Sequence, residues 1–130
     1  MKTRVDIAVK NKTEKNYNCA QAVAAAYADL MGVDEQTALN MTAAFGVGMG
    51  NMEGTCGALT GAGVVIGMIT KDKGEARKRM KVVMDKFQKR NHVTQCKYLK
   101  GLYTGVVLRE CKDCVADACT FLESALADKI

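Results

Sequence analysis

The segment from Cys56 to Ile69, CGALTGAGVVIGMI, leaves few options for the fold of this chain. It has no polar face, so a helix formed by it must be covered by other elements. It is only about half to two-thirds as long as a bilayer-spanning helix and is rich in glycine, so it is predicted to be a buried core helix and not a membrane segment. We expect an all-α, multi-helix bundle around this central, apolar, glycine-rich helix, with Ala58 to Ile69 at its centre.

The rest of the chain has the pattern of further helices. The sequence contains no proline, and alternating apolar and polar runs are scarce, which favours helices over strands. The first three predicted helices run from Arg4 to Lys15, from the N-cap Asn18 to Gly32, and from Asp34 to Phe45, with Gly46 as a left-handed cap. After the apolar helix, we expect a helix over the basic segment and a last helix that begins at Asp113 or just before it. Gly57 and Gly61 are expected to let a neighbouring helix approach closely. Residues 1–130 are predicted to form one domain.

The net charge of +5 comes largely from the residues between Lys71 and Lys100. Apolar residues recur there at helical spacing, at Ala76, Met80, Val83, Met84 and Phe87. The basic residues therefore occupy the outer face of an amphipathic helix, and without interleaved aromatic residues they indicate a solvated face and no nucleic-acid partner.

The start of the chain has charges throughout and no apolar stretch of signal-peptide length, so we expect a cytoplasmic protein. Its six cysteines in 130 residues are at a lower density than in disulfide-built secreted domains, which are also usually shorter. In a reducing compartment, cysteines in this number more often indicate redox chemistry or metal binding than permanent bridges.

Two of the cysteines are predicted to stand at helix starts. Thr55 is the expected N-cap of the apolar helix, which makes Cys56 its first residue, and Cys19 follows the N-cap Asn18 in the same way. Unpaired backbone N–H groups and the positive end of the helix dipole favour a thiolate at such a position. A thiolate is both a nucleophile and a ligand for soft metals, whereas the alternative for each cysteine is a small buried apolar side chain.

The remaining cysteines differ in what they indicate. Cys111 and Cys114 have the C-x-x-C spacing of a dithiol couple or of half a metal site, but no second such pair completes a zinc ribbon. Cys119 lies in the apolar stripe of the last helix and is predicted to pack in the core. The single histidine, His92, is expected at the surface, and its being the only one argues against hydrolytic triads and two-histidine metal sites.

Four blocks of the sequence together resemble a known family: YNCAQAV at 17–23, FGVGMGNMEGTCGALTGAG at 45–63, KFQKRNHVTQCKYLKG at 86–101 and CKDCVADACTFLE at 111–123. Their order and character are similar to the C_GCAxxG_C_C family of redox-active proteins. The resemblance covers nearly the whole chain. It implies that the four characteristic cysteines of the family fall on Cys19, Cys56, Cys96 and Cys111, with Cys114 as the competitor for the fourth place.

The resemblance implies redox activity, and the thiols allow several mechanisms. In the first, a thiol-disulfide oxidoreductase without a required cofactor, a nucleophile such as Cys56 attacks a partner protein's disulfide or a small oxidant, and another cysteine resolves the mixed species. In the second, Cys19, Cys56, Cys96 and Cys111 hold an iron–sulfur cluster or zinc. In the third, the chain is a structural or interaction subunit whose cysteines pack.

Both redox mechanisms require that Cys19, Cys56 and Cys96 come together with Cys111 or Cys114. We also expect the domain to self-associate, as a homodimer, because its small size leaves apolar surface to cover.

Overall fold

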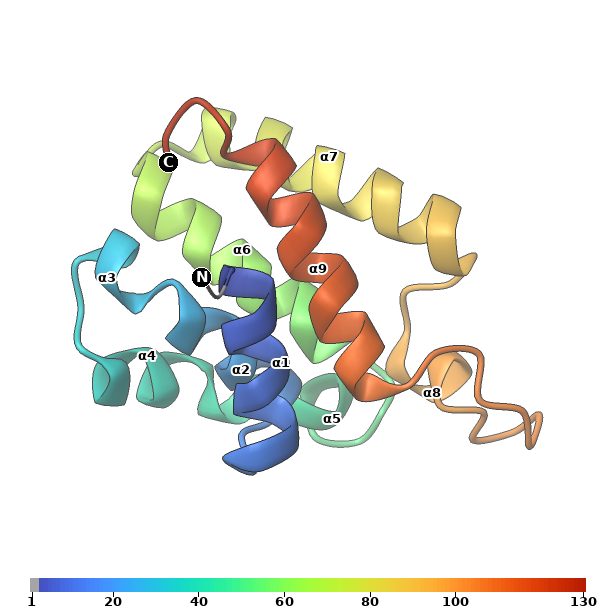
Figure 1. Ribbon diagram of the computed structural model, residues 1–130. Coiled ribbons are helices and arrows are strands. Elements are labelled where there is room, and N and C mark those ends of the chain that lie inside the picture. Colours follow the sequence, from blue (N-terminus) through green and yellow to red (C-terminus); the bar gives the residue numbers. More distant parts are fainter. Residues whose placement is uncertain (1–2) are drawn as a thin grey trace.

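The computed structural model describes residues 3–130, and this part of the chain is helical and contains no strand (Figure 1). The all-α class predicted from the sequence is confirmed. The helical elements are α1 (Arg4–Glu14), α2 (Cys19–Ala26), α3 (Ala28–Met31), α4 (Glu35–Thr42), the 3-10 turn η1 (Ala43–Phe45), α5 (Gly46–Met49), α6 (Gly57–Thr70), α7 (Lys73–Asn91), α8 (Cys96–Leu99) and α9 (Cys111–Ala125). None of the described helices is both long enough and apolar enough to cross a membrane.

The start of α2 is fixed by a reciprocal cap. The side-chain oxygen of Asn18 accepts a hydrogen bond from the backbone N–H of Gln21 at 2.8 Å, and the Gln21 side chain accepts one from the Asn18 N–H at 3.0 Å. The predicted cap is confirmed, so Cys19 is the first residue of α2. The helix expected to reach Gly32 is interrupted at Tyr27, whose φ of −116° and ψ of 10° leave the helical region, and it resumes as α3.

The segment after α4 corrects the prediction for Gly46. This residue has an extended backbone, with φ −72° and ψ 158°, and is not a left-handed cap. Position 46 has no room for a side chain, because a Cβ atom there would lie 2.6 Å from the Cβ of Asn18. The left-handed residues come just after it, at Val47 (φ 54°) and Gly48 (φ 56°).

Helix α6 begins one residue later than predicted, at Gly57, with Cys56 as its N-cap. The physical reason is that Thr55 forms an antiparallel bridge with Gln95, which holds it in an extended conformation outside the helix. A Cβ atom at Gly61 would lie 2.6 Å from the backbone oxygen of Ala20. The expected close approach of a neighbouring helix is thereby confirmed, and the neighbour is α2.

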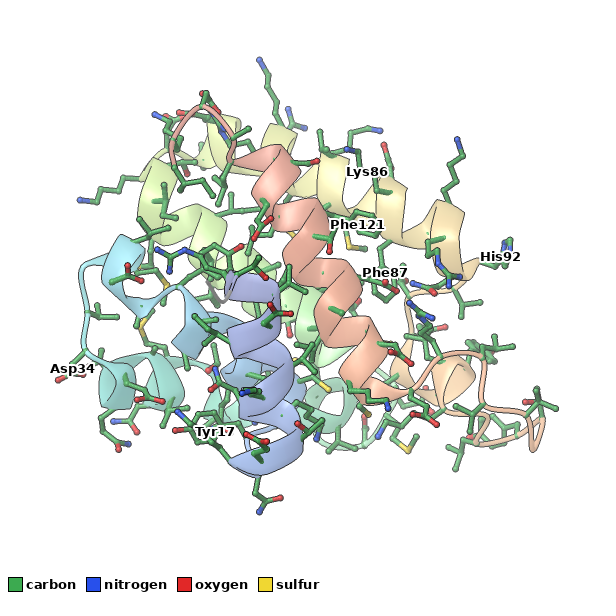
Figure 2. The ribbon with its side chains drawn as sticks, in the orientation of Figure 1. Tyr17, Asp34, Lys86, Phe87, His92 and Phe121 are labelled. Atoms are coloured by element: carbon green, nitrogen blue, oxygen red, sulfur yellow. The ribbon has the colours of Figure 1, made fainter. Side chains whose placement is uncertain are left out.

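Helices α7 and α9 pack against α6 and against each other. Val83 and Phe87 are buried on the inner side of α7, while Lys86 is exposed, as Figure 2 shows for the last two. His92 ends α7 and is exposed, as predicted. Helix α9 begins at Cys111 and so includes both cysteines of the C-x-x-C pair, two residues before the predicted start at Asp113.

Candidate thiol site

Five of the six cysteines line one small cavity of about 40 Å³, which has room for a few water molecules. The lining residues are Lys12, Asn18, Cys19, Val47, Cys56, Gly57, Cys96, Leu99, Lys100, Arg109, Cys111 and Cys114. The predicted convergence of Cys19, Cys56 and Cys96 with Cys111 or Cys114 is confirmed, and both members of the C-x-x-C pair line the cavity. Cys119 does not line the cavity and is fully buried in the core, as its place in the apolar stripe predicted.

Cys19 and Cys56 meet because α2 and α6 begin side by side. A Cβ atom on Gly57 would lie 3.4 Å from the Cβ of Cys19 and 2.9 Å from the backbone oxygen of Phe45. A larger residue at this position would push the two helix starts apart. The glycine after Cys56 therefore has a direct role in bringing the two thiols to the same cavity.

Cys56 and Cys96 are brought together by the bridge between Thr55 and Gln95. The backbone N–H of Cys56 donates to the oxygen of Thr94 at 2.8 Å, and that of Cys96 donates to the oxygen of Gly54 at 3.1 Å. These bonds tie the loop before α6 to the segment that opens α8.

The glycine-rich segment 46–54, which contains α5, packs directly against Cys96. At Gly48, a Cβ atom would lie 2.5 Å from the Cβ of Cys96, and the positive φ disfavours other residues as well. The sequence interpretation of this loop as a helix connection left out this contact. The segment also contributes Val47 to the lining of the cavity.

Cys111 and Cys114 stand one helical turn apart at the start of α9. Cys114 is buried, with 2 % of its surface exposed, and its sulfur lies 3.9 Å from the backbone oxygen of Arg109. Cys111 is half-buried, whereas Cys19, Cys56 and Cys96 are all buried. A reagent from solution therefore reaches Cys111 more easily than any other thiol of the cavity.

Cys19 and Cys111 form a hydrogen-bonded pair that shares one proton. The bond from the Cys19 thiol is the largest influence on Cys111 and, with the Lys100 ammonium and the charge of Lys12, lowers the pKa of Cys111 to about 5 although burial opposes it. The same bond raises the pKa of Cys19, and burial raises it further. At neutral pH, Cys111 is a thiolate and Cys19 holds the proton.

Cys56 and Cys114 form a second pair of the same kind. The hydrogen bond from the Cys114 thiol lowers the pKa of Cys56 against the opposing effect of burial, and the backbone N–H groups of Ala58 and Leu59 lower it further. The bond to Cys56 and burial raise the pKa of Cys114. The helix start thus stabilises a thiolate at Cys56, as the sequence indicated, but only 5 % of the residue's surface is exposed.

For the other two cysteines, burial is the largest influence on the pKa, and it raises the pKa of both Cys96 and Cys119. For Cys96, the positive charge of Lys100 opposes part of this effect.

The basic residues of the site were not predicted from the sequence, because the lysines of this region have the pattern of a solvated face. Lys100 hydrogen-bonds to Cys111, and this contact raises the pKa of its ammonium group. The spacing of Lys100 four residues after Cys96 was a usable signal, since such residues share a helix face. Lys12 and Arg109 also line the cavity, and no local pattern marked them.

The placement of the side chains bears on metal binding. Among residues 3–130, no group of three or more histidine, cysteine, aspartate or glutamate side chains is placed to hold a common metal ion. Four of the cysteines instead interact in two pairs, Cys19 with Cys111 and Cys56 with Cys114, because in each pair the partner thiol is the largest influence on the pKa.

Comparison with known proteins agrees with the character of this site. The family model described as "Putative redox-active protein (C_GCAxxG_C_C)" matches residues 17–125, which is most of the chain and includes all six cysteines. No curated protein and no solved structure matches the chain significantly.

Proposed function

Because the chain belongs to the C_GCAxxG_C_C family, which is described as redox-active, we propose that it exchanges electrons through thiols, with Cys111 as the attacking thiolate and Cys19 as the resolving thiol. The observation that carries the proposal is the state of Cys111. It is half-buried at the cavity, hydrogen-bonded to Cys19 and Lys100, and has a pKa of about 5. A thiolate that is both ionised and accessible is the nucleophile of disulfide exchange.

The exchange proceeds in two steps that conserve electrons and protons. The Cys111 thiolate attacks one sulfur of a substrate disulfide, that S–S bond breaks, and one substrate sulfur leaves as a thiolate. Cys19 then passes its proton to that thiolate and attacks the Cys111 sulfur, which releases the second substrate sulfur. The substrate disulfide gains two electrons, and Cys19 and Cys111 lose two and become a disulfide.

We infer that the substrate disulfide belongs to a partner protein. Five apolar residues between α8 and α9 are half or more exposed: Leu102, Tyr103, Val106, Val107 and Leu108. Val107 lines a surface hollow together with Lys100 and Cys111, so this apolar segment borders the reactive sulfur. An exposed apolar border suits contact with a protein better than contact with a small polar oxidant, which is the other candidate.

The proposal also includes a reducing, cytoplasmic setting, in which the cysteines stay free between reactions. We propose further that α6 is the central helix of the bundle, since it contacts α2, α7 and α9. Self-association as a homodimer stays a prediction.

An iron–sulfur cluster or zinc held by Cys19, Cys56, Cys96 and Cys111 is the alternative. The number of thiols around one cavity favours it, since soft metals prefer thiolates. The arrangement in contacting pairs favours exchange, which needs two sulfurs at a time. Iron and zinc analysis of protein purified without oxygen distinguishes the two, because only the alternative predicts a stoichiometric metal.

The test uses glutathione disulfide as the oxidant and intact-mass spectrometry as the readout. Cys19→Ser should accumulate a mixed disulfide between glutathione and Cys111, because the resolving thiol is missing. Cys111→Ser should form no adduct at neutral pH. Cys119→Ala is the matched control, and it should react like the wild type. If Cys111→Ser reacts at the wild-type rate, the proposed nucleophile is wrong, and if no cysteine of the wild type reacts, the packing role is correct.

A further inference from the structure

The cavity contains two thiol pairs, and the proposed function uses only one of them. Cys19 and Cys111 form the outer couple, which has a half-buried sulfur, and Cys56 and Cys114 form the inner couple, with both sulfurs buried. Resting on the proposed function, we propose that the inner couple is a second redox site, oxidised by the outer couple through exchange between Cys111 and Cys114. One chain would then take part in the transfer of four electrons.

The inner couple has the contact that a disulfide needs but no access to a bulky oxidant. Cys56 and Cys114 line the same cavity, and each is the largest influence on the pKa of the other, which makes the two residues neighbours. Their exposed fractions are 5 % for Cys56 and 2 % for Cys114. A protein disulfide cannot reach sulfurs this deeply buried, so oxidation of the inner couple has to pass through a more exposed thiol of the same cavity.

The spacing of Cys111 and Cys114 supplies that path. The two residues are three apart on α9 and both line the cavity, so their side chains share a helix face, with Cβ atoms about 5–6 Å apart. A disulfide needs a Cβ separation of about 3.5–4.5 Å, so the first turn of α9 must tighten slightly. This turn can adapt, because Cys111 is the first residue of the helix and the N-cap Glu110 makes no side-chain capping bond.

The internal transfer balances in two exchanges. Cys114 gives up its proton and attacks the Cys111 sulfur of the outer disulfide. The bond between Cys19 and Cys111 breaks, and Cys19 leaves and takes the proton. The Cys56 thiolate then attacks the Cys114 sulfur, and Cys111 leaves as a thiolate.

The surroundings of each sulfur favour this direction of transfer. The departing Cys111 thiolate is stabilised by Lys100, which makes it a good leaving group. The attacking Cys56 thiolate is prepared by the N–H groups of Ala58 and Leu59. After the transfer the outer couple is reduced again, and a second substrate disulfide can oxidise it.

The experiment titrates the fully reduced, full-length protein with excess glutathione disulfide without oxygen, and then counts the remaining thiols by alkylation and intact mass. Wild-type protein should lose four thiols, as disulfides between Cys19 and Cys111 and between Cys56 and Cys114 on peptide mapping. Cys114→Ser and Cys56→Ser should each lose only two thiols. Two separate variants are used so that a folding defect in one, detected by circular dichroism, does not decide the result.

Two outcomes separate this inference from the proposed function. If Cys111→Ser is inert but the wild type stops after losing two thiols, the outer couple is correct and the inner site is wrong. If the disulfide between Cys56 and Cys114 forms at the wild-type rate in Cys111→Ser, the inner couple is oxidised directly and the internal transfer is overturned. Cys119→Ala should lose four thiols like the wild type.

Discussion

Replacement of Lys100 by methionine should raise the pKa of Cys111 and change the pH dependence of its reactivity. Lys100 contributes both a hydrogen bond and a positive charge to the thiolate. A hydrogen bond to a charged group contributes about 1.5–3 kcal/mol, which corresponds to roughly one to two pKa units. The bond from Cys19 remains in the variant, so we expect the pKa to rise from about 5 to roughly 6–7 and not to the value of a free thiol.

The assay is the rate of iodoacetamide alkylation at Cys111 from pH 4 to 9, followed by peptide mass spectrometry. Two effects oppose each other, because a thiolate with a higher pKa is less abundant at low pH but more nucleophilic once formed. With a Brønsted coefficient of about 0.4–0.5, the variant should react roughly two- to eightfold more slowly than wild type at pH 5 and roughly three- to tenfold faster at pH 9. The two pH profiles should therefore cross.

The matched control is Lys86→Met, which removes an exposed lysine from the outer side of α7 (Figure 2). Its profile should overlay that of the wild type. An unchanged midpoint in Lys100→Met would refute the assigned role of Lys100. A midpoint raised equally by both variants would show that overall charge, and not the contact with Cys111, sets the pKa.

Two predictions concern stability and are read from urea unfolding. Gly61→Ala should destabilise the fold by about 1–3 kcal/mol, because the new methyl group would lie 2.6 Å from the backbone oxygen of Ala20. Gly63→Ala should stabilise it by up to about 1 kcal/mol, because the nearest atom to its new methyl group lies at an ordinary 3.7 Å. A change in the free energy of unfolding with the same sign in both variants would contradict the packing argument. Tyr27→Phe should stabilise the fold by about 1 kcal/mol, because the buried hydroxyl has no hydrogen-bond partner within residues 3–130, and a loss of stability would show that this hydroxyl is satisfied.

Local signals explain the parts of the fold that the sequence predicted. Asn18 followed by Gln21 is a capping box, which needs only nearby residues, and the apolar stripe of α7 depends only on helical periodicity. The predictions were wrong where contact with a distant segment sets the backbone conformation. Thr55 had the chemistry of an N-cap, but its bridge to Gln95 moved the start of α6 by one residue. The break at Tyr27 occurs without a glycine or proline, at a residue whose side chain is fully buried.

The sequence predicted which cysteines belong to the site, but not which thiols interact with each other. Helix starts indicated Cys19 and Cys56, and the C-x-x-C spacing indicated Cys111 and Cys114. Which thiol contacts which depends on how α9 lies across the starts of α2 and α6, and no local pattern contains this information. The proposed nucleophile is Cys111 instead of Cys56 for the same reason, because the exposed fraction of Cys111 is a property of the assembled cavity.

The convergence of helix starts gives the cavity its chemical character. The first residues of α2 and α9 are Cys19 and Cys111, and the N-cap of α6 is Cys56. Each start carries a partial positive charge, and Lys100 and Lys12 add full charges near Cys111. In each pair, the bond from the partner thiol is the largest influence that lowers the pKa of one sulfur, at Cys111 and at Cys56. The charges of Lys100 and Lys12 add to it at Cys111, and the backbone N–H groups at the start of α6 add to it at Cys56, while the partner thiol keeps its proton. Because the protons are already divided in this way, an attacking thiolate is available in each couple without a histidine base, and the single histidine, His92, is exposed at the end of α7 and does not line the cavity.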